Sequence, residues 1–266
     1  TQTVQEVTAI VTENMSTGDT SVCRMAAAAG ADVIPVDIGV ARPVVGERIR
    51  QYNIRRGTAD MTQGPAMTRE EAVKAVETGI QLVRELKDKG YGLIGTGEMG
   101  IGNTTTSSAL VSVFLNCPPE KVTGRGAGLS SAGLERKIKA IETAIQLNQP
   151  DPAAPIDVLS KVGGLDLAGL CGVFLGGAAC RIPVLVDGFI SSAAALTAAR
   201  LCPNAVDYML GSHASNEPAG RMVLEDLERA RREYEAARLD TLTREEQAAY
   251  QALSQKIQTH IQTVLQ

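Results

Sequence analysis

The feature that most restricts the fold of this 266-residue chain is the alternation of short β-branched segments with longer helical patterns. We expect buried strands at residues 32–40, 92–96, 182–186 and 206–210, each bounded by turn-forming residues. Helical patterns separate these segments, and strands joined through helices pair in parallel. The alternation therefore predicts an α/β fold with a doubly wound, mostly parallel sheet.

The side chains available for packing favour the same architecture. Aromatic residues make up only 3% of the chain, and there is no tryptophan. Alanine, glycine, valine and isoleucine take their place, and such small residues allow backbones to approach closely. A β-sandwich commonly uses aromatic cross-strand pairs, so the composition favours a parallel sheet closely covered by helices.

The expected helices have recognisable ends. The pattern over residues 4–29 is helical, with a break near Gly18 and a cap at Asp19, and Thr68 with Glu71 forms a capping box for a helix reaching Lys89. Residues 41–67 are rich in Arg, Gly, Pro and Asn and predict a long loop, a length that is usually functional. We expect the remaining helices of this part at residues 104–115, 134–147, 156–162, 165–179 and 190–201.

The last part of the chain contains neither glycine nor proline from Arg221 onward. We expect two helices here, the second one starting at Thr243 with Glu246 completing a capping box. The predicted domains are thus a core over residues 1–220 and a helical appendage over 221–266, which packs on the core or on a partner subunit. An apolar stripe on the second helix needs such a surface, and it consists of Tyr250, Leu253, Ile257, Ile261 and Val264.

Composition also excludes several classes of protein. A net charge of −4 and a pI near 5.4, without a basic patch, argue against nucleic-acid binding. We find no apolar stretch long enough for a transmembrane helix and no basic secretory n-region, so we expect a cytoplasmic protein. The five cysteines form no CxxC pair and predict reduced core thiols, while two histidines are too few for a histidine-rich metal site.

A glycine-rich segment follows the strand at 92–96, at the edge of the sheet where ligands bind in such folds. Gly100 and Gly102 permit close approach of the backbone, and Asn103 and Thr104 then begin a helix with free N–H groups. This arrangement suits a phosphate or a carboxylate. The segment is not a Walker loop, since no GK[ST] follows, and a purely structural strand-to-helix turn is the alternative.

Two further segments favour the phosphate. The glycine-rich loop 124–133 surrounds Arg125 and includes Gly126, and it leads into a helix that carries Lys137. Residues 212–215, which include Ser215, follow the last expected strand. Converging glycine loops, a lysine and several hydroxyl groups describe a site for a phosphorylated sugar. For Lys137 the alternative is a solvated position on its helix.

These residues resemble a known family. EMGIGNTTTSSA at 98–109 resembles the signature loop of nicotinate-nucleotide:dimethylbenzimidazole phosphoribosyltransferases, which activate the lower ligand of cobamides. The resemblance runs collinearly over residues 3–225 through eight further segments: VTAI (7–10), PVDIGV (35–40), GPAMTREEA (64–72), TGRGAGL (123–129), LERK (134–137), VGGLDLAGL (162–170), PVLVDGFISSAAAL (183–196) and SHASNEP (212–218).

The resemblance implies transfer of 5-phosphoribosyl from nicotinate mononucleotide to an aromatic base, without a metal or an organic cofactor. By analogy the catalytic Glu98 lies near the ribose, and the base lies between the opening helix and the end of the helical tail. The opening helix contributes Thr3, Val7 and Val11 to the base site. The analogy assigns the phosphate and the ribose to Gly100, Gly102, Asn103, Thr104, Gly126, Lys137 and Ser215.

Departures from the family pattern bear on the catalytic end and on the acceptor. The family's PGSLG-type segment and DHG strand end are not matched, and Thr241 stands at the position of its general-base glutamate. Asp240 is the nearest carboxylate, although a shift of one residue turns a helical side chain by about 100°. Val11 stands where some relatives have a polar residue that contacts the base, so benzimidazole, purine and phenolic acceptors all remain open.

Three explanations fit these departures. The chain is incomplete, or it is one subunit of a hetero-oligomer whose partner supplies the base, or it is a non-catalytic protein that binds the ribotide. We expect a homodimer or a heterodimer.

Overall fold

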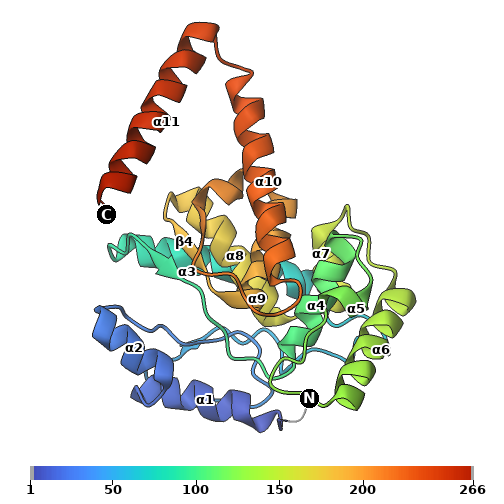
Figure 1. Ribbon diagram of the computed structural model, residues 1–266. Helices are drawn as coiled ribbons and strands as arrows, with labels where there is room; N and C mark the ends of the chain where they lie inside the picture. Colours follow the sequence, from blue (N-terminus) through green and yellow to red (C-terminus); the bar gives the residue numbers. More distant parts are fainter. Residues whose placement is uncertain (1–2, 265–266) are drawn as a thin grey trace.

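The computed structural model describes the backbone of residues 3–264, and the side chains of this range except Ser254 and residues 257–264 (Figure 1). The first half of the chain forms α1 (Glu6–Thr17), α2 (Ser21–Ala29), β1 (Val36–Asp37), β2 (Arg50–Gln51), α3 (Arg69–Asp88), β3 (Ile94–Gly95), α4 (Asn103–Phe114) and α5 (Pro119–Val122). The second half forms α6 (Ser131–Asn148), α7 (Pro155–Val162), α8 (Leu165–Cys180), β4 (Val184–Val186), α9 (Gly188–Leu201), the 3₁₀ helix η1 (Pro203–Tyr208), β5 (Met209–Gly211), α10 (Gly220–Leu239) and α11 (Arg244–Val264).

The strands confirm the α/β class and the parallel pairing. β3, β4 and β5 form one sheet with β4 in the centre, in the register Ile94 to Val184 and Val184 to Met209. β1 and β2 form a separate parallel pair in which Val36 faces Arg50. The paired segments are shorter than the sequence indicates, and β2 lies inside the stretch 41–67 that we expected to be a loop.

The prediction of a strand over residues 206–210 is wrong in its boundaries. Residues 203–208 form the 3₁₀ helix η1, which begins at Pro203, and β5 starts only at Met209. Proline fixes φ near the helical value and lacks an N–H, so it is well suited to the first position of a helix. The apolar residues of η1, such as Val206, are buried by a helical turn and not by the sheet.

The expected helix caps are present with one exception, and α6 starts at Ser131, three residues before the expected Leu134. Thr68 and Glu71 form the expected capping box of α3, and Thr243 forms the corresponding contacts with Glu246 before α11. The exception is the cap of α2, where Thr20 and not Asp19 accepts the N–H of Cys23 at 3.3 Å. Gly18 ends α1 in the left-handed region, which moves the start of the next helix one residue further along the chain.

The core is closed by a backbone-to-backbone contact between α3 and α8. A Cβ atom on Gly79 would lie 2.0 Å from the carbonyl oxygen of Gly169. A Cβ on Gly172 would lie 2.0 Å from the carbonyl oxygen of Val76. Only glycine permits this spacing, so the small-residue composition is expressed as close packing of helices. Larger side chains such as Phe174 and Leu167 are fully buried in the same core.

The first C-terminal helix, α10, starts on the core and then extends away from it, as Figure 1 shows. Val223 and Leu227 of α10 are buried, and Asp226 accepts a hydrogen bond from Arg200 of α9 at 2.7 Å. α11 folds back beside the far end of α10, where Tyr250 donates to Glu235 at 2.6 Å. Within the predicted apolar stripe, Leu253 is exposed, and the side chains of Ile257, Ile261 and Val264 lie outside the described residues.

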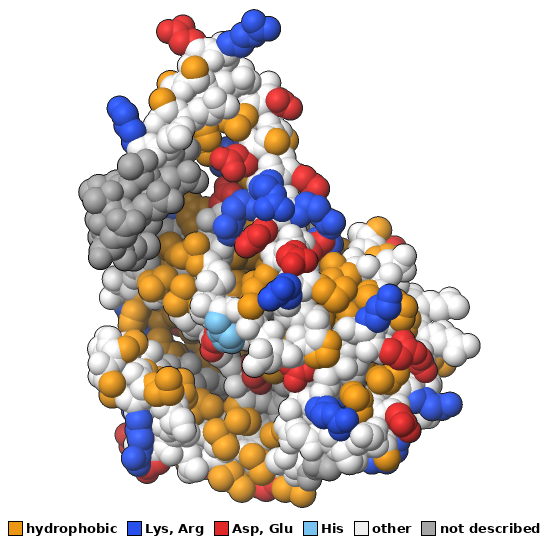
Figure 2. All heavy atoms as spheres, in the orientation of Figure 1, with side chains coloured by type: hydrophobic (Ala, Val, Ile, Leu, Met, Phe, Trp, Pro, Cys, Tyr) orange, Lys and Arg blue, Asp and Glu red, His pale blue; other side chains and the backbone are white. Residues whose placement is uncertain are grey.

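No helix in the described part of the chain is both long and apolar enough to cross a membrane. On the face shown in Figure 2, basic and acidic side chains are interspersed and do not form a block of one sign. All five cysteines are free thiols, and of these only Cys202 is exposed.

Candidate active site at the carboxyl ends of the strands

The loop after β3 turns the chain from the sheet into α4. Thr96 fastens this loop to the neighbouring strand by donating its hydroxyl to the Leu185 carbonyl at 2.7 Å. The chain enters α4 through Gly102, whose φ of 100° lies in the left-handed region and which offers no side chain to cap the helix. The N-terminus of α4 therefore remains without a side-chain cap, in an arrangement suited to an anion.

The amide of Asn103 connects two carboxylates at this turn. Its Nδ2 donates to Asp166, the second residue of α8, at 2.8 Å, and also to Glu98. The backbone N–H of Gly100 donates to the same Glu98 oxygen at 3.1 Å. A Cβ on Gly100 would lie 2.7 Å from Asn103 Nδ2 and 2.8 Å from Asp166 Oδ2, so the network requires glycine at this position.

Both carboxylates hold their protons more strongly than ordinary ones. Protein atoms around Glu98 desolvate its carboxylate and raise its pKa, although the residue remains open to solvent at the edge of the site. The nearby charges of Asp166 and Asp187 raise this pKa further, against the hydrogen bonds from Asn103 and Gly100. Burial likewise raises the pKa of Asp166. Three carboxylates therefore lie at the ribose end of the predicted site, and two of them, Glu98 and Asp166, have raised pKa values.

Thr104, the next residue of α4, contacts the ammonium group of Lys137. Lys137 Nζ donates to the Thr104 hydroxyl at 2.9 Å and to the Gly124 carbonyl at 3.0 Å. Lys137 is only 6% exposed, so the alternative of a solvated lysine is wrong. Burial lowers the pKa of Lys137, and the negative charge of Glu217 opposes this effect. We call Lys137, Thr104, Gly124 and Gly126 the cradle.

Gly126 closes the cradle from the side of the 124–133 loop. A Cβ at this position would lie 2.8 Å from the Thr104 hydroxyl and 3.6 Å from Lys137 Nζ. Ser215 belongs to the loop between β5 and α10, where its hydroxyl accepts the N–H of Glu217 at 3.3 Å. The same loop begins with Ser212 and His213, and His213 Nδ1 lies 3.5 Å from a carboxylate oxygen of Asp187.

The opening helix reaches the site through one hydrogen bond. The N–H of Ile101 donates to the Thr8 hydroxyl at 3.0 Å, which fixes α1 against the loop after β3. Val11 lies one turn beyond Thr8 on the same face of α1, and Val7 and Val11 are both half-buried. Thr3 lies just before the first turn of α1 and is also half-buried. Figure 1 places α11 on the opposite side of the core from α1, so the structure does not bring the helical tail to these residues.

Asp240 is also not brought to the site. It is the C-cap of α10, at the exposed turn before α11. α10 has 20 residues, and at about 1.5 Å per residue its two ends lie roughly 30 Å apart. Because α10 starts beside Ser215, Asp240 lies at the far end of this length.

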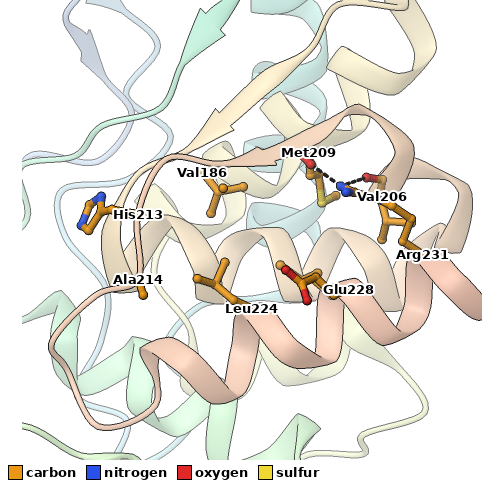
Figure 3. Close-up of a pocket in the computed structure, with 10 residues that line it drawn as sticks. Val186, Val206, Met209, His213, Ala214, Leu224, Glu228 and Arg231 are labelled. Carbon is orange, nitrogen blue, oxygen red and sulfur yellow. Dashed lines mark hydrogen bonds between the residues drawn. The ribbon is translucent and has the colours of Figure 1, made fainter. Parts of the chain in front are cut away.

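A pocket of about 290 Å³ lies beside the site, between β5 and α10 (Figure 3). Arg231 of α10 donates to the carbonyls of Val206, at 2.8 Å, and Met209 at one end of this pocket, and His213 lies at the other. None of the predicted site residues lines it. The lining residues are Val186, Val206, Met209, Gly211, His213, Ala214, Leu224, Leu227, Glu228 and Arg231.

Four residues join the site that the sequence did not single out: Thr8, Asp166, Asp187 and Glu217. Asp187 directly follows β4. Its position at the end of a strand is the signal that indicates it from the sequence, because ligands bind at strand ends in such folds. In the described part of the chain no group of three or more His, Cys, Asp and Glu side chains is arranged to hold a metal ion.

Known proteins share most of this chain. A family model described as phosphoribosyltransferase matches residues 1–232. Proteins named nicotinate-nucleotide–dimethylbenzimidazole phosphoribosyltransferase are 51% identical over 223 residues in Acetivibrio thermocellus and 50% over 224 in Clostridium acetobutylicum. Each alignment covers 84% of this chain and 64% of the relative, so the chain spans less than two thirds of the length of these relatives.

A solved structure agrees with these matches. The structure of CobT from Thermus thermophilus superimposes with a TM-score of 0.81 at 37% identity, over 85% of this chain and 68% of that one. The identity to these relatives and the similarity of fold both agree with the match of the family model. The chain belongs to the phosphoribosyltransferase family that its 98–109 segment resembles.

Proposed function

We propose that this chain carries the phosphoribosyl-transfer site of an enzyme that moves 5-phosphoribosyl from nicotinate mononucleotide to an aromatic base. The product is an α-ribotide, which serves as the lower ligand of a cobamide. One observation carries the proposal. Asn103 and Thr104 are consecutive at the start of α4, and the first contacts two carboxylates while the second contacts a buried lysine. A phosphorylated sugar is negative at its phosphate and becomes positive at C1′ during transfer. It therefore suits a site with a cation at one end and carboxylates at the other.

The cationic end suits the 5′-phosphate. In the proposal, the N-terminus of α4, which no side chain caps, binds the phosphate oxygens, and the Lys137 ammonium supplies the positive charge. Gly126 lets the backbone of the 124–133 loop approach Thr104 and Lys137 closely, because a Cβ at this position would lie 2.8 Å from the Thr104 hydroxyl. The Ser215 hydroxyl approaches from the loop before α10.

The acidic end suits the ribosyl centre. Departure of nicotinate leaves positive charge spread over C1′ and the ring oxygen, and the carboxylates of Glu98, Asp166 and Asp187 stabilise that charge. The acceptor then forms the new bond to C1′, through a ring nitrogen of an azole or through the hydroxyl oxygen of a phenol, and loses a proton. The raised pKa of Glu98 brings this group closer to the pH at which a general base works efficiently.

The acceptor is proposed to lie against α1. Thr8 holds this helix to the loop that carries Glu98, and Val7 and Val11 offer half-buried apolar surface for a planar ring. The ring class remains benzimidazole, purine or phenol.

A second candidate function is a subunit that binds the ribotide while another chain supplies the catalytic carboxylate. The position of Asp240 favours it, because this residue lies at the far end of α10 from Ser215. In this case the chain binds nicotinate mononucleotide but does not turn it over alone.

The experiment measures nicotinate released from nicotinate mononucleotide with a panel of azoles and phenols, with and without a candidate partner chain. Turnover that falls in Glu98→Gln and persists in the exposed control Glu77→Gln supports the first proposal. If calorimetry detects binding but the chain alone shows no turnover, and a partner chain restores turnover, the second proposal is supported. No turnover with any acceptor in either format overturns the enzymatic proposal.

A further inference from the structure

The carboxylate of Glu217 meets the cradle at one backbone position. A Cβ on Gly124 would lie 1.7 Å from Glu217 Oε2 and 2.7 Å from its carboxyl carbon, so the carboxylate rests directly on this glycine. The carbonyl of the same glycine accepts a hydrogen bond from Lys137 Nζ at 3.0 Å. Lys137 and Glu217 therefore contact one residue, and Gly124 sets their spacing.

Glu217 is also an exception among buried polar groups. Its Oε2 atom is buried and has no hydrogen-bond partner among the described residues. A carboxylate oxygen removed from water without a hydrogen bond is costly unless a nearby positive charge compensates. Lys137 is a buried ammonium group, and it would be costly without a nearby negative charge. Each group thus provides the compensation that the other needs.

No other charged side chain of the described residues competes for Lys137. α4, which packs against α6, carries no charged residue. In the 123–130 loop, Arg125 donates to the Leu129 carbonyl and to Ser131. Of the acidic groups on the neighbouring helices, Glu120 of α5 contacts Glu142 and Asp157 of α7 pairs with Lys161.

We propose that Glu217 is a positioning residue of the phosphate cradle, which keeps the buried Lys137 protonated and directed at the start of α4. This inference rests on the proposed function for its ligand, although the electrostatic relationship is a property of the free chain. The same turn also places a second ligand group, because the Glu217 N–H donates to the Ser215 hydroxyl. Glu217 acts through Lys137 and Ser215 and does not itself contact the phosphate.

The test is a titration of the Lys137 side chain in the unliganded full chain. The ¹³Cε signal of Lys137, assigned by its disappearance in Lys137→Arg, is followed by NMR between neutral and alkaline pH. In Glu217→Gln, which keeps the side-chain shape, we expect the Lys137 midpoint to fall by about one pH unit or more. The matched control Glu135→Gln removes an exposed carboxylate from the helix that carries Lys137 and should leave the midpoint in place. Equal midpoints in the wild type and Glu217→Gln overturn the inference.

A second measurement links the titration to the ligand. Calorimetry with nicotinate mononucleotide at several pH values should show that Glu217→Gln loses affinity at a lower pH than the wild type. A purely structural role would weaken binding equally at every pH and leave the titration unchanged. If Glu217→Gln does not fold, Glu217→Asp retains the charge farther from Gly124 and should give a smaller shift in the same direction. Absence of binding in the wild type contradicts the proposed function, while the titration still decides the inference.

Discussion

Asn103 donates its side-chain amide to the carboxylate of Asp166 across 2.8 Å, and these residues are 63 positions apart in the chain. This bond joins the start of α4 to the start of α8, and the same amide also holds Glu98. Asn103 is therefore the point at which the glycine-rich loop, the two carboxylates and the start of α4 are fixed relative to one another.

Replacing Asn103 by alanine should lower both stability and activity. The substitution leaves the desolvated Asp166 carboxylate without its amide partner, and such a loss costs about 1–3 kcal/mol. Urea unfolding measures this loss, and the rate of nicotinate release should fall with it. Gln146→Ala removes an exposed amide from α6 and serves as the control. A variant as stable as the wild type would show that the bond to Asp166 contributes nothing.

Asp166 should make the folding stability depend on pH. Its pKa is raised in the folded state above the ordinary value of 3.8, so the folded state retains this proton more strongly than the unfolded state. The contribution is fully present below pH 3.8, and it is lost as the pH rises from there to the raised pKa, by about 1.4 kcal/mol per pH unit. Asp166→Asn should remove this part of the decline in urea unfolding at a series of pH values. The control Glu135→Gln should retain it, and an unchanged slope in Asp166→Asn would contradict the assignment.

Lys137→Ala should weaken binding of nicotinate mononucleotide at least tenfold. A charge-assisted hydrogen bond contributes about 1.5–3 kcal/mol, and about 1.4 kcal/mol corresponds to a factor of ten in affinity. Calorimetry provides the measurement. Lys139→Ala removes an exposed lysine from the same helix and should bind normally. Equal affinity in the two variants would show that the cradle does not bind the phosphate.

Asp226 should be required for the docking of α10 on α9. Its carboxylate is almost fully buried and accepts hydrogen bonds from Arg200 and Arg229, of which Arg229 is largely exposed. Asp226→Ala leaves Arg200 without its partner, so we expect a loss of about 2 kcal/mol after allowing for solvent around the arginines. Thermal unfolding with a double-mutant cycle to Arg200 isolates the pair, and Glu225→Ala on the exposed face is the control. Additive effects of the two substitutions would mean that the pair has no coupling energy.

Asp240→Asn should leave the binding of nicotinate mononucleotide unchanged, because Asp240 and the cradle lie at opposite ends of α10. The rate of nicotinate release by the isolated chain, where measurable, should also be unaffected. A tenfold loss in the presence of a partner chain, but not in its absence, would instead place Asp240 in a site formed between subunits.

Local signals in the sequence predicted much of this structure. The capping box of Thr68 and Glu71 determines the start of α3, and Gly100 to Thr104 predicted an uncapped helix after a strand. Lys137 was selected because it follows a glycine-rich loop. In each case the determining residues lie within a few positions of one another.

The remaining part of the site depends on contacts between distant segments. Thr8 meets Ile101 across 93 positions, and Glu217 meets Gly124 through a loop that no local pattern directs toward it. The first residue of β5 could not be predicted either. The residues before it belong to η1, and they are apolar because they are buried, as strand residues are. Burial determines such composition, and either conformation satisfies it.

The glycine contact between α3 and α8 has a mechanical consequence for catalysis. Since backbone rests on backbone at Gly79 and Gly172, neither helix can slide or rotate along the other without a collision of main-chain atoms. Asp166 stands at the start of α8, so this packing also positions the carboxylate that accepts the hydrogen bond of Asn103. Under the proposed function, the packing of α8 then sets the position of Asp166, and motion that admits a substrate falls to the surrounding loops.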